Sequence, residues 1–102
     1  MIRHVVMWRL KEEALGQAKS QLAEELRRLL EGLVGKIPCI LTLEVGFNTV
    51  PSDTATDVCL VSTFEDPAAL QAYIDHPEHK KVAAFLKDVV AERRANDFVV
   101  LA

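Results

Sequence analysis

Three stretches of the chain alternate between apolar and polar residues as strands do. In Ile2–Leu10, odd and even residues point to opposite sides of the strand, and both sides are apolar because Val5 and Met7 lie opposite the others. Val58–Phe64 is also apolar on both faces, whereas residues 40–49 have one apolar face. We therefore predict three strands, of which the first and third are covered on both sides. The face of the first strand opposite Val5 and Met7 contains Ile2, His4, Val6, Trp8 and Leu10.

Helical periodicity separates the first two strands. From about residue 13 to residue 34, apolar residues recur at intervals of three and four, which predicts an amphipathic helix with one buried stripe. Gly35 and Pro38 then favour the end of this helix. The stripe contains Leu15, Ala18, Leu22, Leu26, Leu29, Leu30 and Leu33.

A second helical region follows the third strand. Asp66 is a suitable N-cap, and Pro67 is a suitable first helical residue. Pro77 interrupts this region, so a last helix is expected over residues 77–94, followed by a short closing strand over residues 98–101. The side chains expected to point inward from the last helix are those of Val82, Phe85, Leu86, Val89 and Val90.

The predicted order of elements is β, α, β, β, α, β. This order is typical of an α+β, ferredoxin-like (βαββαβ) sandwich, and the length suits a single domain over residues 1–102. Two helices cover only one face of such a sheet, so the apolar residues of the other face need a further partner. A second copy of the chain is the simplest partner, and we predict a homodimer formed through the sheet face.

Composition and charge exclude several classes of function. Half of the residues are hydrophobic, and 12 basic and 15 acidic residues give a formal net charge of −3, with no run of Lys or Arg longer than a pair. We therefore expect that it binds neither nucleic acid nor membranes. The first residues lack the features of a secretory signal, so we expect a cytoplasmic protein. Cys39 and Cys59 show no spacing typical of a metal or redox site, so we expect two reduced thiols.

The segment AYIDHPEHKKV, residues 72–82, brings a tyrosine and two histidines close to Pro77. Pro77 disfavours helical dihedral angles at His76, so the chain should turn there and place His79 in the first turn of a new helix. The positive end of that helix should lower the pKa of His79, which keeps the imidazole neutral and able to act as a base. Tyr73 is then suited to donate a hydrogen bond to a carbonyl oxygen.

Several segments of the sequence resemble the stress-responsive A/B barrel domain (Dabb) family, within the dimeric α+β barrel superfamily. The segments are IRHVVMWRLK, IPCILTLEVGFN, VSTFEDPAALQAYIDHPEHKKV and DFV, which together cover nearly the whole chain. The most specific part is the series Phe-Glu-Asp, Leu, Tyr and His-Pro-x-His between Phe64 and His79. The resemblance implies a ferredoxin-like protomer whose sheet pairs with the sheet of a second subunit to form a barrel.

The resemblance also implies roles for individual residues. The family includes uncharacterised bacterial proteins, stable stress-associated plant oligomers and a plant polyketide cyclase that uses a histidine as base and a tyrosine as its partner. The matching residues here are His79 and Tyr73, which are our candidate catalytic residues. The strand-one histidine of the cyclase matches His4, which we interpret as part of a pocket wall. The candidate ligand-binding residues are His4, Val6, Trp8, Leu60 and His76.

Each of these residues also has a structural interpretation. His76, before a proline, is suited to cap a helix, and His4 is suited to a hydrogen-bonded position in the core. Trp8 either fills core volume or narrows a cavity. Tyr73 and His79 could serve only to fix the helix corner, and the sequence leaves these alternatives open.

Three functions are compatible with the sequence. The first is the binding of a small apolar or aromatic ligand, with cyclase-like proton transfer by Tyr73 and His79. The second is a non-enzymatic, stress-associated oligomer, and the third, by analogy of fold alone, is a cofactor-independent monooxygenase or a haem-degrading protein. We expect no cofactor and no metal site made of side chains. The resemblance is also compatible with a divalent cation held by backbone carbonyls around residues 34–40.

Overall fold

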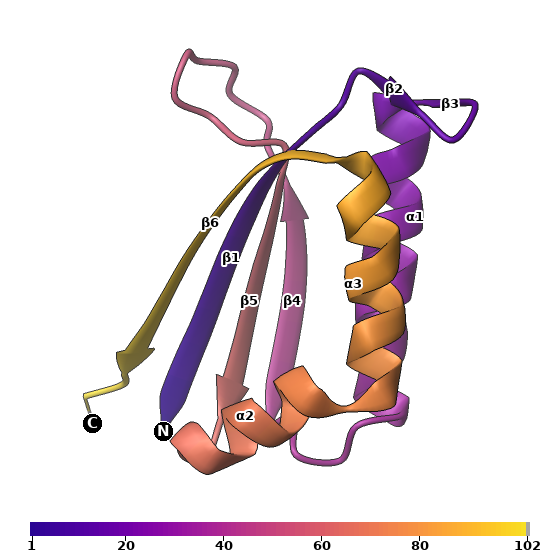
Figure 1. Cartoon of the computed structure of the whole chain (residues 1–102). Coiled ribbons are helices and arrows are strands. Elements are labelled where there is room, and N and C mark those ends of the chain that lie inside the picture. Colours follow the sequence, from indigo (N-terminus) through magenta and orange to yellow (C-terminus); the bar gives the residue numbers. More distant parts are fainter. Residues whose placement is uncertain (102) are drawn as a thin grey trace.

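The computed structural model describes residues 1–101 and shows a four-stranded antiparallel sheet with the helices gathered on one side of it (Figure 1). The strands follow the spatial order β4-β5-β1-β6, which is the ferredoxin-like α+β sandwich predicted from the order of elements. The strands of the sheet are β1 (Ile2–Leu10), β4 (Thr42–Phe47), β5 (Val58–Phe64) and β6 (Val90–Val99). The helices are α1 (Lys19–Gly32), α2 (Pro67–Asp75) and α3 (Pro77–Val89), with a 3-10 turn, η1 (Leu33–Gly35), after α1.

β1 occupies a central place in the sheet and positions the residues of the helix-covered face. It pairs antiparallel with β5 on one side and with β6 on the other. In the second pairing, His4 lies opposite Asp97 and Trp8 lies opposite Arg93. Paired residues of antiparallel strands point to the same face of a sheet. The register therefore brings two charged residues of β6 to the same face as His4 and Trp8.

The core lies between this face and the helices. Leu22, Leu26 and Leu30 of α1 are fully buried at intervals of four, as the predicted apolar stripe requires. They pack in one cluster with the inward-facing residues of the sheet and of the later helices. α1 and α3 contact each other and stand side by side over the sheet (Figure 1).

The first helix starts later than predicted. Residues 13–18 form a hairpin of two short strands, β2 (Glu13–Ala14) and β3 (Gln17–Ala18), instead of the first turn of a helix. The two residues of the turn, Leu15 and Gly16, have φ angles of 52° and 73°, which a right-handed helix does not allow. Positive φ at both positions is the geometry of a type I′ hairpin. Leu15 is consequently exposed and does not belong to the buried stripe.

The last helix ends earlier than predicted, and the closing strand is longer. α3 stops at Val89, and residues 90–99 form β6 along the whole length of β1. Ala, Glu and Arg between residues 91 and 95 have good helix propensity, but pairing with a central strand overrides this weak local preference. The register of β6 shifts by one between Arg9 and Leu10, which leaves Ala91 as a bulge.

Among residues 1–101, no helix or other segment covers the second face of the sheet. Met7 keeps 39% of its surface exposed, and Phe98 keeps 43%. Val5, Cys59 and Val61 are partly exposed beside them on the same face. We call these five residues the open face. The strands predicted to be covered on both sides are thus covered on only one side by the chain itself.

Among residues 1–101, no helix is both long and apolar enough to cross a membrane.

Candidate functional site

A tight corner between α2 and α3 positions the tyrosine and the two histidines. α2 begins as predicted, because the Asp66 carboxylate accepts a hydrogen bond from the Ala69 backbone N–H at 2.8 Å and Pro67 is the first helical residue. The helix ends at Asp75. His76 then adopts an extended conformation, with φ −66° and ψ 137°, and Pro77 starts α3.

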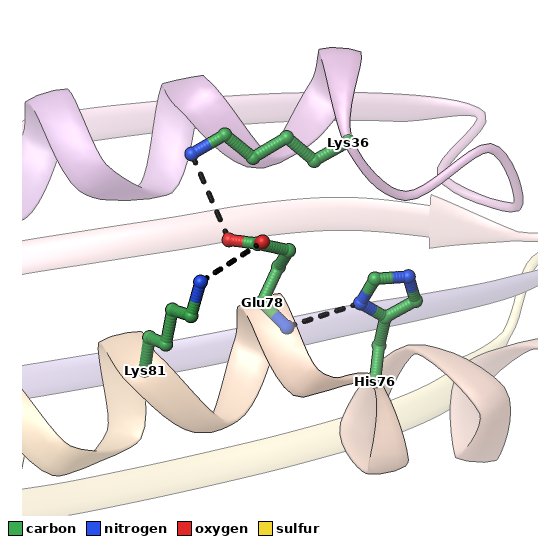
Figure 2. A network of polar contacts seen from close by, with 4 residues as sticks. All are labelled: Lys36, His76, Glu78 and Lys81. Carbon is green, nitrogen blue, oxygen red and sulfur yellow. Dashed lines mark hydrogen bonds and ion pairs between the residues drawn. The ribbon is translucent and has the colours of Figure 1, made fainter.

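His76 acts as the N-cap of α3. Its Nδ1 atom accepts a hydrogen bond from the Glu78 backbone N–H at 3.1 Å (Figure 2). The Glu78 carboxylate forms ion pairs with Lys81 at 3.2 Å and with Lys36, in the segment after η1, at 3.7 Å. The hydrogen bond from Lys81 is the main cause of a lowered pKa at Glu78. These contacts fix the corner without using the side chain of Tyr73.

A cavity of about 250 Å³ lies between the sheet and the helices beyond this corner. Its lining is mostly aliphatic, with contributions from β1, β5, α1, α2, α3 and β6. His76 is not among the described residues that line it, so the structure does not support the prediction that His76 contacts a ligand there. The other predicted site residues all line this cavity: His4, Val6, Trp8, Leu60, Tyr73 and His79.

Tyr73 lines the cavity and is fully buried. Its ring lies edge-on to the ring of His79, with 4.6 Å between the ring centroids, and 6.1 Å from the ring of His4. The Tyr73 hydroxyl has no hydrogen-bond partner among residues 1–101. Burial raises the pKa of Tyr73 to about 12. The phenol therefore keeps its proton at neutral pH and is available as a hydrogen-bond donor.

His79 is held in its neutral form by its surroundings. Burial is the largest cause of its lowered pKa, and the nearby His4 lowers the pKa further. Hydrogen bonding to the backbone of Ile74 acts in the opposite direction, and the charge of Arg93 again lowers the pKa. The sequence also predicted a lowered pKa for His79, so the direction agrees. The main cause of the lowered pKa is burial, whereas the prediction from the sequence was based on the positive end of the helix.

We expect an NMR titration of His79 to give a pKa below its ordinary value of 6.5. Because the unfolded chain then binds a proton more readily than the folded chain, the stability contributed by neutral His79 should be complete above pH 6.5 and decrease as the pH falls toward the folded pKa. The variant His79→Gln should accordingly lose less stability than the wild type between pH 7 and pH 5 in urea unfolding. A measured pKa above 6.5 would contradict this description.

His4 is almost fully buried and has one ring nitrogen already engaged. Its Nδ1 atom lies 2.5 Å from Oδ1 of Asp97, whose side chain is partly exposed. This contact orients the imidazole and leaves Nε2 as the nitrogen available on the other side of the ring. Local sequence patterns do not connect Asp97 with His4, because 93 residues separate the two. Only the register of β6 on β1 identifies the pair.

Trp8 both fills core volume and forms part of the cavity wall. Only 3% of its surface is exposed, and its indole N–H has no hydrogen-bond partner among the described residues. Two residues of the cavity wall thus carry buried donors without partners among residues 1–101, the indole N–H of Trp8 and the hydroxyl of Tyr73. Lys87 and Arg93 also line the cavity, although the sequence did not single them out.

Neither cysteine nor the described carboxylates form a metal site. Cys39 and Cys59 are free thiols. Within residues 1–101, no group of three or more His, Cys, Asp or Glu side chains is arranged to hold a metal ion. A cation bound by backbone carbonyls around residues 34–40 stays a prediction.

Comparisons with known proteins agree with the fold and the sequence motifs. The model of the family described as "Stress responsive A/B Barrel Domain" matches residues 2–100. A search of the curated proteins gives no significant match. Many solved structures match this chain. Three of them illustrate the range of sequence identity and TM-score.

The first is a dimeric protein of unknown function with a ferredoxin-like fold from Bacteroides fragilis, which is 26% identical with a TM-score of 0.84 over 95% of this chain and 93% of that one. A Dabb family protein with a ferredoxin-like fold from Mesorhizobium loti is also 26% identical, with a TM-score of 0.66 over 99% and 97% of the two chains. A hydroxynitrile lyase from Passiflora edulis is 16% identical, with a TM-score of 0.81 over 98% and 93%. This last similarity shows the fold alone.

Proposed function

The chain belongs to the stress-responsive A/B barrel domain family, and from this membership together with its cavity we propose that it binds a small apolar or aromatic ligand and moves a proton on it through Tyr73 and His79. The single observation that carries the proposal is the unpaired, fully buried hydroxyl of Tyr73 beside His79. A buried donor without a partner costs roughly 1 to 3 kcal/mol. A carbonyl oxygen of a ligand would satisfy it.

The proposed reaction follows from the protonation states of Tyr73 and His79. A neutral His79 accepts a proton from the carbon next to the ligand carbonyl, while Tyr73 donates a hydrogen bond to the carbonyl oxygen and stabilises the enolate that forms. The imidazolium of His79 then returns the proton or passes it to the product. The low polarity of the cavity strengthens the hydrogen bond from Tyr73.

The alternative of a purely structural corner receives less support from these contacts. His76, Glu78 and the two lysines already fix the junction of α2 and α3 (Figure 2). The hydroxyl of Tyr73 takes no part in that network. No contact among the described residues of the cavity specifically favours a monooxygenase.

We also propose that the protein is a homodimer joined through the open face. Apolar side chains occupy the centre of this face on β1 and β5, whereas Glu44 and Arg94 lie toward its edges on β4 and β6. An apolar centre with a charged rim is usual for a protein interface. The description of the Bacteroides fragilis protein as dimeric supports the same assembly.

Exchange of carbon-bound protons tests the proposed reaction directly. Acetophenone has one ring, one carbonyl and acidic methyl protons, and we expect the protein to catalyse the exchange of those protons for deuterium in D₂O, followed by NMR. His79→Gln should slow the exchange about 100-fold or more, because a positioned base contributes that much. His76→Gln is the matched control, since it changes a histidine of the same corner that does not line the cavity.

The outcomes separate binding from chemistry. Shifts of the Tyr73 and His79 resonances without any exchange would support a binding protein and reject the proton transfer. The absence of both shifts and exchange for acetophenone and related aromatic ketones would contradict the proposed function. Equal exchange rates in the two histidine variants would remove His79 from the mechanism.

A further inference from the structure

The cavity has cationic side chains but no carboxylate in its lining. Lys87, near the end of α3, and Arg93, on β6, both line it, and no Asp or Glu among the described residues does so. Neither cation forms an ion pair with a carboxylate within residues 1–101. Neighbouring cations differ in this respect, since Arg94 pairs with Glu92 at 3.1 Å. The two cations of the cavity are thus free to bind a ligand.

Two further polar groups of the wall, besides the two histidines, are also donors. The Trp8 indole N–H and the Tyr73 hydroxyl are buried and unpaired, and Arg93 lies opposite Trp8 in the strand register. An ionised carboxylate only accepts hydrogen bonds, and its two oxygens match the fork of a guanidinium. The charge of Arg93 is also among the causes of the lowered pKa of His79, after burial and His4.

The two cations also show where a ligand enters. Lys87 and Arg93 are exposed, whereas His4, Trp8 and Tyr73 on the inner wall are buried. These two exposed residues place the entrance near the point where α3 ends and β6 begins. The volume of about 250 Å³ exceeds the roughly 150 Å³ that suffices for benzene. One ring with one or two substituents fits.

We propose that the natural ligand is a small carboxylic acid with a single ring or an apolar body of similar size, bound as its anion. The carboxylate pairs with Arg93 and Lys87 at the entrance, the apolar body lies against the aliphatic side chains of the wall, and the hydroxyl of Tyr73 stays available for a carbonyl oxygen of the ligand. This inference rests on the proposed function because it uses the same cavity. It adds the charge of the ligand and the residues that select it.

The test compares acids with their neutral amides. Calorimetric titrations of benzoate against benzamide, and of phenylacetate against phenylacetamide, should show that the protein prefers the acid of each pair by about tenfold or more. Arg93→Gln should weaken the binding of the acids by about 10-fold to 100-fold, since a hydrogen bond to a charged group is lost, and leave the amides within about twofold. Lys87→Gln should have a smaller effect of the same kind.

Arg94→Gln is the matched control. Arg94 is the next residue on β6, has the same charge and points to the other face of the sheet, opposite Met7. Its replacement should leave the binding of the acids unchanged. We also expect the protein to bind phenyl phosphate more weakly than benzoate.

Three results would overturn the inference. These are equal affinities for acid and amide, acid binding that Arg93→Gln and Lys87→Gln together leave unchanged, and tighter binding of phenyl phosphate than of benzoate. Acetophenone has no carboxylate and its proton exchange is measured separately, so each of these results leaves the proposed function standing. Conversely, if the protein does not catalyse acetophenone exchange, the same titrations still test its preference for carboxylates.

Discussion

Replacing Tyr73 by phenylalanine should raise the free energy of unfolding by about 1 kcal/mol, even though the residue is fully buried. The substitution removes a hydroxyl that has no partner among the described residues and keeps the ring that packs 4.9 Å from Phe64. An unpaired buried hydroxyl costs roughly 1 to 3 kcal/mol, so its removal stabilises the fold. In a domain of this size the melting temperature should rise by about 4 to 8 °C, measured by calorimetry.

The same variant should lose function. Without the hydrogen bond to the developing enolate, acetophenone exchange should fall about 100-fold, which is typical for the loss of one such donor. His76→Ala provides the opposite control, because losing the cap of α3 should cost about 1 kcal/mol and leave exchange intact. If Tyr73→Phe is clearly destabilising, its hydroxyl has a structural partner, and the role of Tyr73 as a free donor is wrong.

Replacing Val61 by lysine should dissociate the dimer at low micromolar concentration. Val61 lies opposite Val5 in the centre of the open face. An unpaired charge buried there costs several kcal/mol, which exceeds what a small interface can lose without dissociating at this concentration. Sedimentation velocity should show a dimer for the wild type and a particle near 11.4 kDa for the variant.

The controls for this experiment use the same change at other places. Val50→Lys alters an exposed loop residue and should leave the dimer intact. Circular dichroism should show that the Val61→Lys chain is still folded, because its side chain is partly exposed in the single chain and strand propensities span only about 1 kcal/mol. A monomeric wild type, or a Val61→Lys variant that stays dimeric, would reject the proposed interface.

The sequence was sufficient where local chemistry decides the structure. Alternation in Ile2–Leu10 is confirmed, and it correctly places His4 and Trp8 on one face. Asp66 and Pro67 start α2, and Pro77 divides the two later helices, because caps and prolines act on their immediate neighbours. These features also bring Tyr73 and His79 together, so the sequence predicts this pair as well as the wall residues His4, Val6, Trp8 and Leu60.

The sequence was insufficient where distant segments decide the structure. The polar residues of β6 have the composition of a helix, and only pairing with β1 makes them a strand. Asp97 and Arg93 join the site through this pairing, so neither was predicted. The β2–β3 hairpin was missed although Gly16 offered a local signal, because apolar spacing through Leu15 and Ala18 imitated a helix.

The bulge at Ala91 determines the sign of the charge at the cavity entrance. Had the ladder continued evenly from the pairing of Leu10 with Val90, Glu92 would lie opposite Trp8, and Arg93 would turn to the open face. Asn96 would then replace Asp97 opposite His4. One extra backbone residue thus converts an entrance that would repel anions into one that attracts them. Ligand preference in this fold can therefore change through the register of one strand while every side chain stays the same.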